Sequence, residues 1–172
     1  MKKEGKLMIS KDIIIPKVSD GKHVIWSSSY SIGIPKIDDQ HKELLEFVNG
    51  LYSHATGDDA AEQVYFSQVI HKLIEYTKYH FANEEKMMVA TKFPGYEEHK
   101  KDHEEFVRTI IKTAKDYEAG RRLTLEKLAH FLKDWVLSHI AVRDMVYSQY
   151  FKKIATRKSD GTLSITATDI KK

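Results

Sequence analysis

Apolar residues recur every three or four positions in four long segments of the chain, and this spacing is typical of amphipathic α-helices. It predicts helices over residues 38–56, 58–90, 96–119 and 124–150. Only short connections separate these segments, so neighbouring helices should run in opposite directions. We therefore expect an all-α protein, an up-down-up-down four-helix bundle with short N- and C-terminal extensions.

Capping and turn residues mark the expected helix ends. Asp38 or Asp39 can cap the first helix, and Gly57 ends either that helix or the turn after it. Asp59 and Glu62 have the spacing of a capping box, which places the start of the second helix at residues 58–59.

The two ends of the chain lack the helical pattern. We expect an N-terminal extension over residues 1–22, a bundle domain over 23–154 and a C-terminal tail over 155–172. Ile13–Ile15, before Pro16, favours a short extended piece, and residues 163–168 alternate in polarity like a β-strand. We expect these two pieces to pair against one end of the bundle.

The composition of the chain limits its possible binding partners, its location and its metal ligands. The net charge of +3 is spread without a long basic block, so we expect no nucleic-acid binding. No run approaches the ~18 apolar residues of a membrane span, and no apolar signal sequence follows the charged N-terminus. These features favour a cytoplasmic protein, for which we expect a monomer. The chain has no cysteine, so any metal site must use nitrogen and oxygen ligands.

Each expected helix places a metal-ligating side chain on its apolar face. These residues are His41 in the first helix, His80 and Glu84 in the second, His99 and His103 in the third, and His139 in the fourth. Two of the pairs are four residues apart, so both members lie on one side of a helix. Asp144 follows His139 by five residues, and only a π-type bulge or a long reach would bring it back to that side.

A single histidine on an apolar helix face is more often a core residue than a ligand. Five of them on four helices, with acidic residues beside them, form a different pattern. Without a metal ion, several buried polar groups would lack partners at about 1–3 kcal/mol each. The pattern therefore predicts a metal centre inside the bundle. The remaining histidines do not fit it, and we expect them at the surface or outside the ligand set: His23, His54, His71 and His130.

Four sequence segments together resemble the hemerythrins, especially their bacterial single-domain type. The segments are Ile37–His41, His80–Glu84, His99–His103 and Trp135–Asp144. The resemblance extends over about residues 26–150 and leaves both ends of the chain outside it. It implies a non-haem di-iron centre that binds O2.

The resemblance also implies a role for each candidate ligand. One iron would be held by His99, His103 and His139, and the other by His41 and His80. Glu84 and Asp144 would bridge the two irons together with a shared oxo or hydroxo group. The iron with two histidines would keep an open position for O2.

The family pattern further implies an apolar pocket that keeps water and protons away from bound oxygen. By position its wall would consist of Leu44, Phe81, Trp135, Val136 and Ile140. The same residues also suit an ordinary bundle core, and the two interpretations are compatible. Val136, one turn before His139, is where a larger aliphatic side chain would shield the site better.

These features favour reversible O2 binding for storage, delivery or sensing, and we expect no enzymatic activity. The alternative is a di-iron enzyme or scavenger that acts on peroxide or nitric oxide. A sensor or adaptor that uses the terminal extensions as partner contacts is a third possibility. A structural zinc or manganese site is a fourth, since nitrogen and oxygen ligands are not specific to iron.

Overall fold

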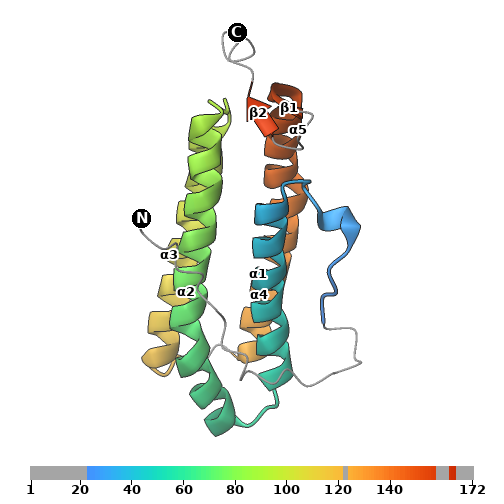
Figure 1. Cartoon of the computed structure of the whole chain (residues 1–172). Helices are drawn as coiled ribbons and strands as arrows, with labels where there is room; N and C mark the ends of the chain where they lie inside the picture. The colour runs from blue at the N-terminus through green and yellow to red at the C-terminus, as the bar shows by residue number, and fades with distance from the viewer. Residues whose placement is uncertain (1–22, 122–123, 158–162, 166–172) are drawn as a thin grey trace, which may run out of the picture.

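The structure, a computed structural model, describes residues 23–121, 124–157 and 163–165. Its main elements are α1 (Pro35–His54), α2 (Asp59–Ala90), α3 (Tyr96–Glu118), α4 (Leu125–His139) and α5 (Met145–Ile154). A π-helical turn, η2 (Ile140–Asp144), joins α4 to α5, and a short 3-10 helix, η1 (Ser28–Tyr30), precedes α1. Figure 1 shows the long helices side by side in a bundle, and α4, η2 and α5 follow one another directly as its fourth helical segment. This arrangement confirms the expected four-helix bundle.

The first helix begins at Pro35, three residues before the expected cap at Asp38. Proline is favoured in the first turn of a helix because its missing N–H would have no partner there. Asp38 instead bonds back to the preceding loop: its carboxylate accepts hydrogen bonds from Ile32 N at 2.8 Å and Ser31 Oγ at 2.6 Å. Asp38 therefore fixes the entry of the chain into α1 from inside the first turn.

The second helix is capped by Asp58, whose carboxylate accepts from the amides of Ala60 and Ala61. Glu62 does not complete a capping box with Asp58: its carboxylate accepts from the amide of Gly57, the residue before the cap, at 2.8 Å. The expected start of the helix at residues 58–59 is confirmed, whereas the capping box expected from Asp59 and Glu62 is wrong, because Asp58 is the cap and Glu62 bonds to Gly57. Glu62 is buried and also accepts from Leu125 N at 3.4 Å, which ties the start of α2 to the start of α4.

The C-terminal strand prediction is confirmed in part. β2 (Leu163–Ile165) pairs antiparallel with β1 (Ala155–Arg157), which follows α5 directly. The described partner of the strand is therefore a neighbouring segment. The N-terminal piece that we expected as its partner, Ile13–Ile15, lies outside the described residues.

The core runs along the whole bundle and is rich in aliphatic and aromatic residues, with Tyr76, Phe66 and Tyr147 among the largest fully buried side chains. The buried polar residues include all seven candidate metal ligands, which lie toward the end of the bundle where α2 ends and α3 begins. Within the described part of the chain, no helix is both long and apolar enough to cross a membrane.

Candidate metal centre

The seven candidate ligands come from each of the long helical segments of the bundle. They are His41 on α1, His80 and Glu84 on α2, His99 and His103 on α3, His139 at the end of α4 and Asp144 at the end of the π turn. None is more than 6% exposed. Two groups have ligand atoms close enough to hold a metal ion, and Glu84 belongs to both: Glu84 with His99, His103 and His139, and Glu84 with His41 and His80.

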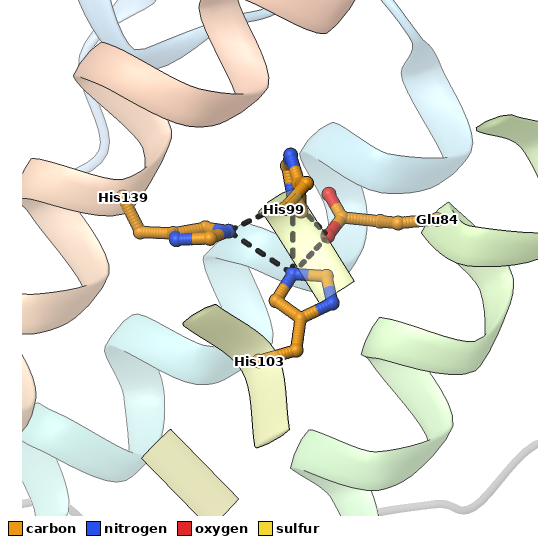
Figure 2. A group of neighbouring side chains, drawn as sticks. All are labelled: Glu84, His99, His103 and His139. Atoms are coloured by element: carbon orange, nitrogen blue, oxygen red, sulfur yellow. Dashed lines mark hydrogen bonds and ion pairs between the residues drawn. The ribbon is translucent and has the colours of Figure 1, made fainter. Parts of the chain in front are cut away.

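Three imidazoles form the core of the first group (Figure 2). The Nε2 atoms of His99, His103 and His139 lie 3.0 Å from one another. A metal–imidazole bond is about 2.1 Å long, so two such nitrogens at right angles on one ion lie about 3.0 Å apart, against about 3.4 Å on a tetrahedral ion. The spacing therefore fits three adjacent ligands of an octahedral ion better than a tetrahedral zinc site.

Hydrogen bonds among the three Nε2 atoms would satisfy these nitrogens less well than a metal ion between them. The Glu85 carboxylate can only accept, so Nδ1 of His103 donates to it over 3.0 Å. In the neutral ring this leaves a lone pair on Nε2 of His103, directed at the other two Nε2 atoms. Lone pairs that converge in this way need a cation between them.

The second group is smaller. Nε2 of His41 lies 3.7 Å from Oε1 of Glu84, and Nε2 of His80 lies 3.7 Å from Oε2. The two rings are in edge contact with centroids 4.9 Å apart. Nδ1 of His80 donates to Oε1 of Gln40 at 3.1 Å, which turns the Nε2 lone pair of the neutral ring toward Glu84. This group supplies two imidazoles where the first supplies three.

The two carboxylates lie between these groups. Oδ1 of Asp144 is 3.3 Å from Nε2 of both His99 and His139, whereas Oδ2 is 3.3 Å from Nε2 of His41. Oε2 of Glu84 approaches Nε2 of His103 to 3.2 Å, while Oε1 faces His41. Asp144 thus presents one oxygen to each group, whereas Glu84 directs Oε1 at His41 and Oε2 at both His103 and His80. Both carboxylates contact both groups, as residues that join two metal ions must.

The π turn brings Asp144 into this position. Five residues of regular α-helix would turn its side chain about 140° away from that of His139. The structure contains a π turn over Ile140–Asp144, and Asp144 is fully buried beside His139. Of the two possibilities left open by the sequence, a bulge and a long reach, the structure contains the bulge.

Several polar atoms of the site are buried without a hydrogen-bond partner. They are both oxygens of Glu84, both oxygens of Asp144 and both ring nitrogens of His41. A buried carboxylate without compensation is strongly unfavourable, whereas a multivalent cation would satisfy both oxygens. The donor set therefore fits two metal ions bound by nitrogen and oxygen.

The pKa values of the histidines and carboxylates in the metal-free site reflect their burial and their contacts with one another. Burial alone would lower the pKa of His41 and His99, but contacts with Asp144 and Glu84 raise both to about 9. Burial lowers the pKa of His80 to about 4 despite the nearby charge of Glu84. Burial alone would raise the pKa of Glu84 and Asp144, yet the surrounding histidines lower both below their usual range. At neutral pH His41 and His99 are thus protonated in the metal-free protein, and their positive charges stabilise the two carboxylates as metal ions would.

Two contacts around the site were missed by the sequence analysis. Gln40 lies next to His41 in the sequence and bonds to His80, and Glu85 lies next to Glu84 and bonds to His103. Such contacts fix the tautomer and the orientation of a ligating ring. Adjacent positions on a helix point about 100° apart, so spacing alone assigns neither residue to the site.

The expected pocket wall is apolar and mostly buried. Leu44, Phe81, Val136 and Ile140 are buried, whereas Trp135 is partly exposed. Phe81 stacks on His103 with ring centroids 3.7 Å apart, and Trp135 stacks on His139 at 4.3 Å. Thus at least Phe81 and Trp135 contact the candidate ligands directly.

The other four histidines do not join the two ligand groups. His54 stacks on Tyr65, His130 bonds to Tyr52, His23 bonds to Ser53, and His71 is exposed.

A helical bundle with two histidine groups joined by two carboxylates belongs to the class of non-haem dinuclear metalloproteins. The family model "Hemerythrin HHE cation binding domain" matches residues 32–151. The chain belongs to the hemerythrin family, whose members bind O2 at a non-haem di-iron centre.

Individual relatives support this identification. The chain is 33% identical over 125 residues to a bacteriohemerythrin of Pseudomonas aeruginosa (strain LESB58), covering 73% of this chain and 79% of the relative. It is 32% identical over 124 residues to the myohemerythrin of Sipunculus nudus, covering 72% of this chain and 89% of the relative. A crystal structure of wild-type hemerythrin matches with a TM-score of 0.66 and 27% identity, covering 73% of this chain and 95% of the other.

Proposed function

We propose that this protein binds O2 reversibly and that its seven buried site residues hold the two irons. His99, His103 and His139 would hold one iron, and His41 and His80 the other. Glu84 and Asp144 would bridge them. When bound, the two irons supply the electrons that make O2 binding strong and yet reversible.

The observation that carries this proposal is the position of Asp144. Its two oxygens lie 3.3 Å from histidines of different groups, with His99 and His139 on one side and His41 on the other. A carboxylate that served one metal ion would not need to face both groups. The unequal histidine count supports O2 binding on the side of His41 and His80, where the protein supplies one ligand fewer.

The surrounding residues would orient the ligands and keep the site dry. Gln40 and Glu85 hold Nδ1 of His80 and His103, so the Nε2 atoms stay directed at the site. Leu44, Val136 and Ile140 are buried, and their side chains carry no exchangeable proton. Exclusion of water and protons would preserve bound O2, because its loss as hydrogen peroxide, which is autoxidation, requires protons.

We propose a carrier or sensor role in preference to turnover of peroxide or nitric oxide. Turnover of peroxide requires proton delivery, and the apolar residues of the expected wall cannot donate protons. The cytoplasmic location, the monomeric state and the division of the chain at residues 22 and 154 remain predictions.

The test is metal analysis combined with a visible spectrum recorded through repeated cycles of air and inert gas. We expect two irons per chain and a colour that appears with O2 and disappears without it. Asp144→Ala should lose this colour, and His71→Ala, which changes an exposed histidine on α2, should keep it. Continuous consumption of O2, peroxide or nitric oxide, or full iron content in Asp144→Ala, would contradict the proposal.

A further inference from the structure

Arg143 occupies an unusual place beside the metal centre. It lies within the π turn, directly before Asp144, and is 37% exposed. Its Nε atom lies 2.5 Å from Oδ2 of Asp102, and its Nη2 atom lies 3.2 Å from Oε1 of Glu98. The guanidinium thus joins the π turn to two carboxylates of α3.

Both carboxylates flank the turn of α3 that contributes to the site. Glu98 directly precedes His99, and Asp102 directly precedes His103. On the other helix, Arg143 directly precedes Asp144. The ion pairs therefore connect the outer sides of the two backbone segments whose inner sides carry His99, His103 and Asp144.

Close packing does not hold the two segments together at this point. A cleft of about 360 Å³ opens between α3 and α4, with Phe106, Trp135 and His139 among its lining residues. Asp102 and Arg143, which form an ion pair with each other, also line this cleft.

The π turn needs such support before metal is bound. A π turn is rarer and less favourable than a continuous α-helix, and here it must present a buried carboxylate toward a second one, Glu84. Neither carboxylate has a hydrogen-bond partner in the interior. A regular helix would release Asp144 from this position. Its contacts with His41, His99 and His139 hold it from the inside, and a contact on the outer side of the turn adds to them in keeping the less favourable π register.

We propose that Arg143 is a positioning residue that acts through Asp144. Its ion pairs with Asp102 and Glu98, here called the Arg143 latch, hold the π turn against α3 and so preorganise Asp144 between the histidines. This proposal rests on the proposed function in one respect, because it takes Asp144 as a metal ligand. Its effect on the π turn exists in the metal-free protein as well.

The test compares Arg143→Gln, which removes the charge, with Arg143→Lys, which keeps it. The control is Arg108→Gln, which removes an exposed arginine of α3 that pairs with Glu104 at 3.7 Å. Two quantities are measured in each variant: hydrogen exchange of the amides of residues 140–145 in the metal-free protein, and the rate of iron release to a chelator from the loaded protein.

We expect Arg143→Gln to speed local exchange and iron release by about fivefold, the effect of a moderately strong ion pair. Arg143→Lys should recover part of the loss, and Arg108→Gln should match the wild type. Exchange in the middle of α2 and the melting temperature of the metal-free protein should hardly change. A purely structural ion pair would instead lower the melting temperature and speed exchange throughout α4 and α5.

Unchanged exchange and iron release in Arg143→Gln would overturn the proposal. If Arg143→Gln does not fold, the proposal is tested by the salt dependence of hydrogen exchange in the metal-free wild type. Salt screens ion pairs, so high salt should speed exchange at residues 140–145 and leave α2 unaffected, and equal effects in both places would contradict the latch. The exchange measurement uses no iron, so it stands even if metal analysis rejects the di-iron function.

Discussion

Glu85 accepts a hydrogen bond from Nδ1 of His103 at 3.0 Å and is itself 23% exposed. A carboxylate in this position makes the imidazole a better ligand and holds its ring in one orientation. The bond thus links the candidate metal centre to the solvent-facing side of α2.

Replacing Glu85 should weaken iron binding without removing a ligand. We expect Glu85→Ala to lower iron affinity by roughly 10- to 100-fold, the usual effect of losing such a contact, and Glu85→Gln to lower it less. Competition with a chelator measures the affinity. Glu75→Ala, an exposed acid on the same helix, serves as the control, and equal affinities in all four proteins would argue against a role for Glu85.

Glu84 and His80 should differ in the damage that their loss causes. Glu84 belongs to both ligand groups, whereas His80 belongs to one. We expect Glu84→Ala to lose both irons and the O2-dependent colour, and His80→Ala to retain more iron. Elemental analysis and visible spectra give the comparison. A fully iron-loaded Glu84→Ala with normal spectra would refute its bridging role.

Val136 should control how long the O2 complex lasts. It is 3% exposed and lies one turn before His139, so a longer side chain there would shield the site from water and protons. We expect Val136→Leu to slow autoxidation severalfold and Val136→Ala to accelerate it. The measurement is the decay of the O2-bound spectrum in air. Leu128→Met, a volume-conserving change two turns further away on α4, is the control, and an unchanged or faster rate in Val136→Leu would count against this role.

The stability of the metal-free protein should peak near pH 6.5. His41 and His99 have a pKa of about 9 in the folded protein, above the usual 6.5, so their contribution is complete below pH 6.5 and is lost as the pH rises through 9. His80, with a pKa of about 4, destabilises the fold as the pH falls from 6.5 through 4. The lowered pKa values of Glu84 and Asp144 add to the loss of stability in acid.

Urea unfolding at several pH values measures this profile, with the iron-loaded protein as the comparison. Iron replaces the protons on the ligand histidines, so the loaded protein should not lose stability between pH 6.5 and 9. A metal-free protein with constant stability over that interval would show that His41 and His99 are not protonated in the folded state.

Asp38 should stabilise the fold more than its neighbour Asp39. Asp38 is 8% exposed and accepts hydrogen bonds from Ser31 and Ile32, while Asp39 forms an exposed ion pair with Lys42. We expect Asp38→Ala to lower the free energy of unfolding by about 1–3 kcal/mol and Asp39→Ala by about 0.5 kcal/mol or less. Chemical denaturation of the metal-free proteins gives both values, and equal losses would contradict this role of Asp38.

The sequence by itself determined the helices and the residues that meet at the site. Helical periodicity and capping are local properties, so they can be recognised without knowledge of long-range contacts. The four-residue spacings of His80–Glu84 and His99–His103 place each pair on one helix face. Their apolar surroundings place that face in the core, and the structure brings these four residues together.

Contacts outside the individual helices decided the rest. The first helix begins at Pro35 because Asp38 bonds to the loop before it, and β2 pairs with β1 in a hairpin next to α5. The sequence left the direction of Asp144 open, because a π turn is less favourable locally than a regular helix. Burial of Asp144 among histidines of three other segments, and the ion pairs of Arg143 with α3, exist only in the folded bundle and select that turn.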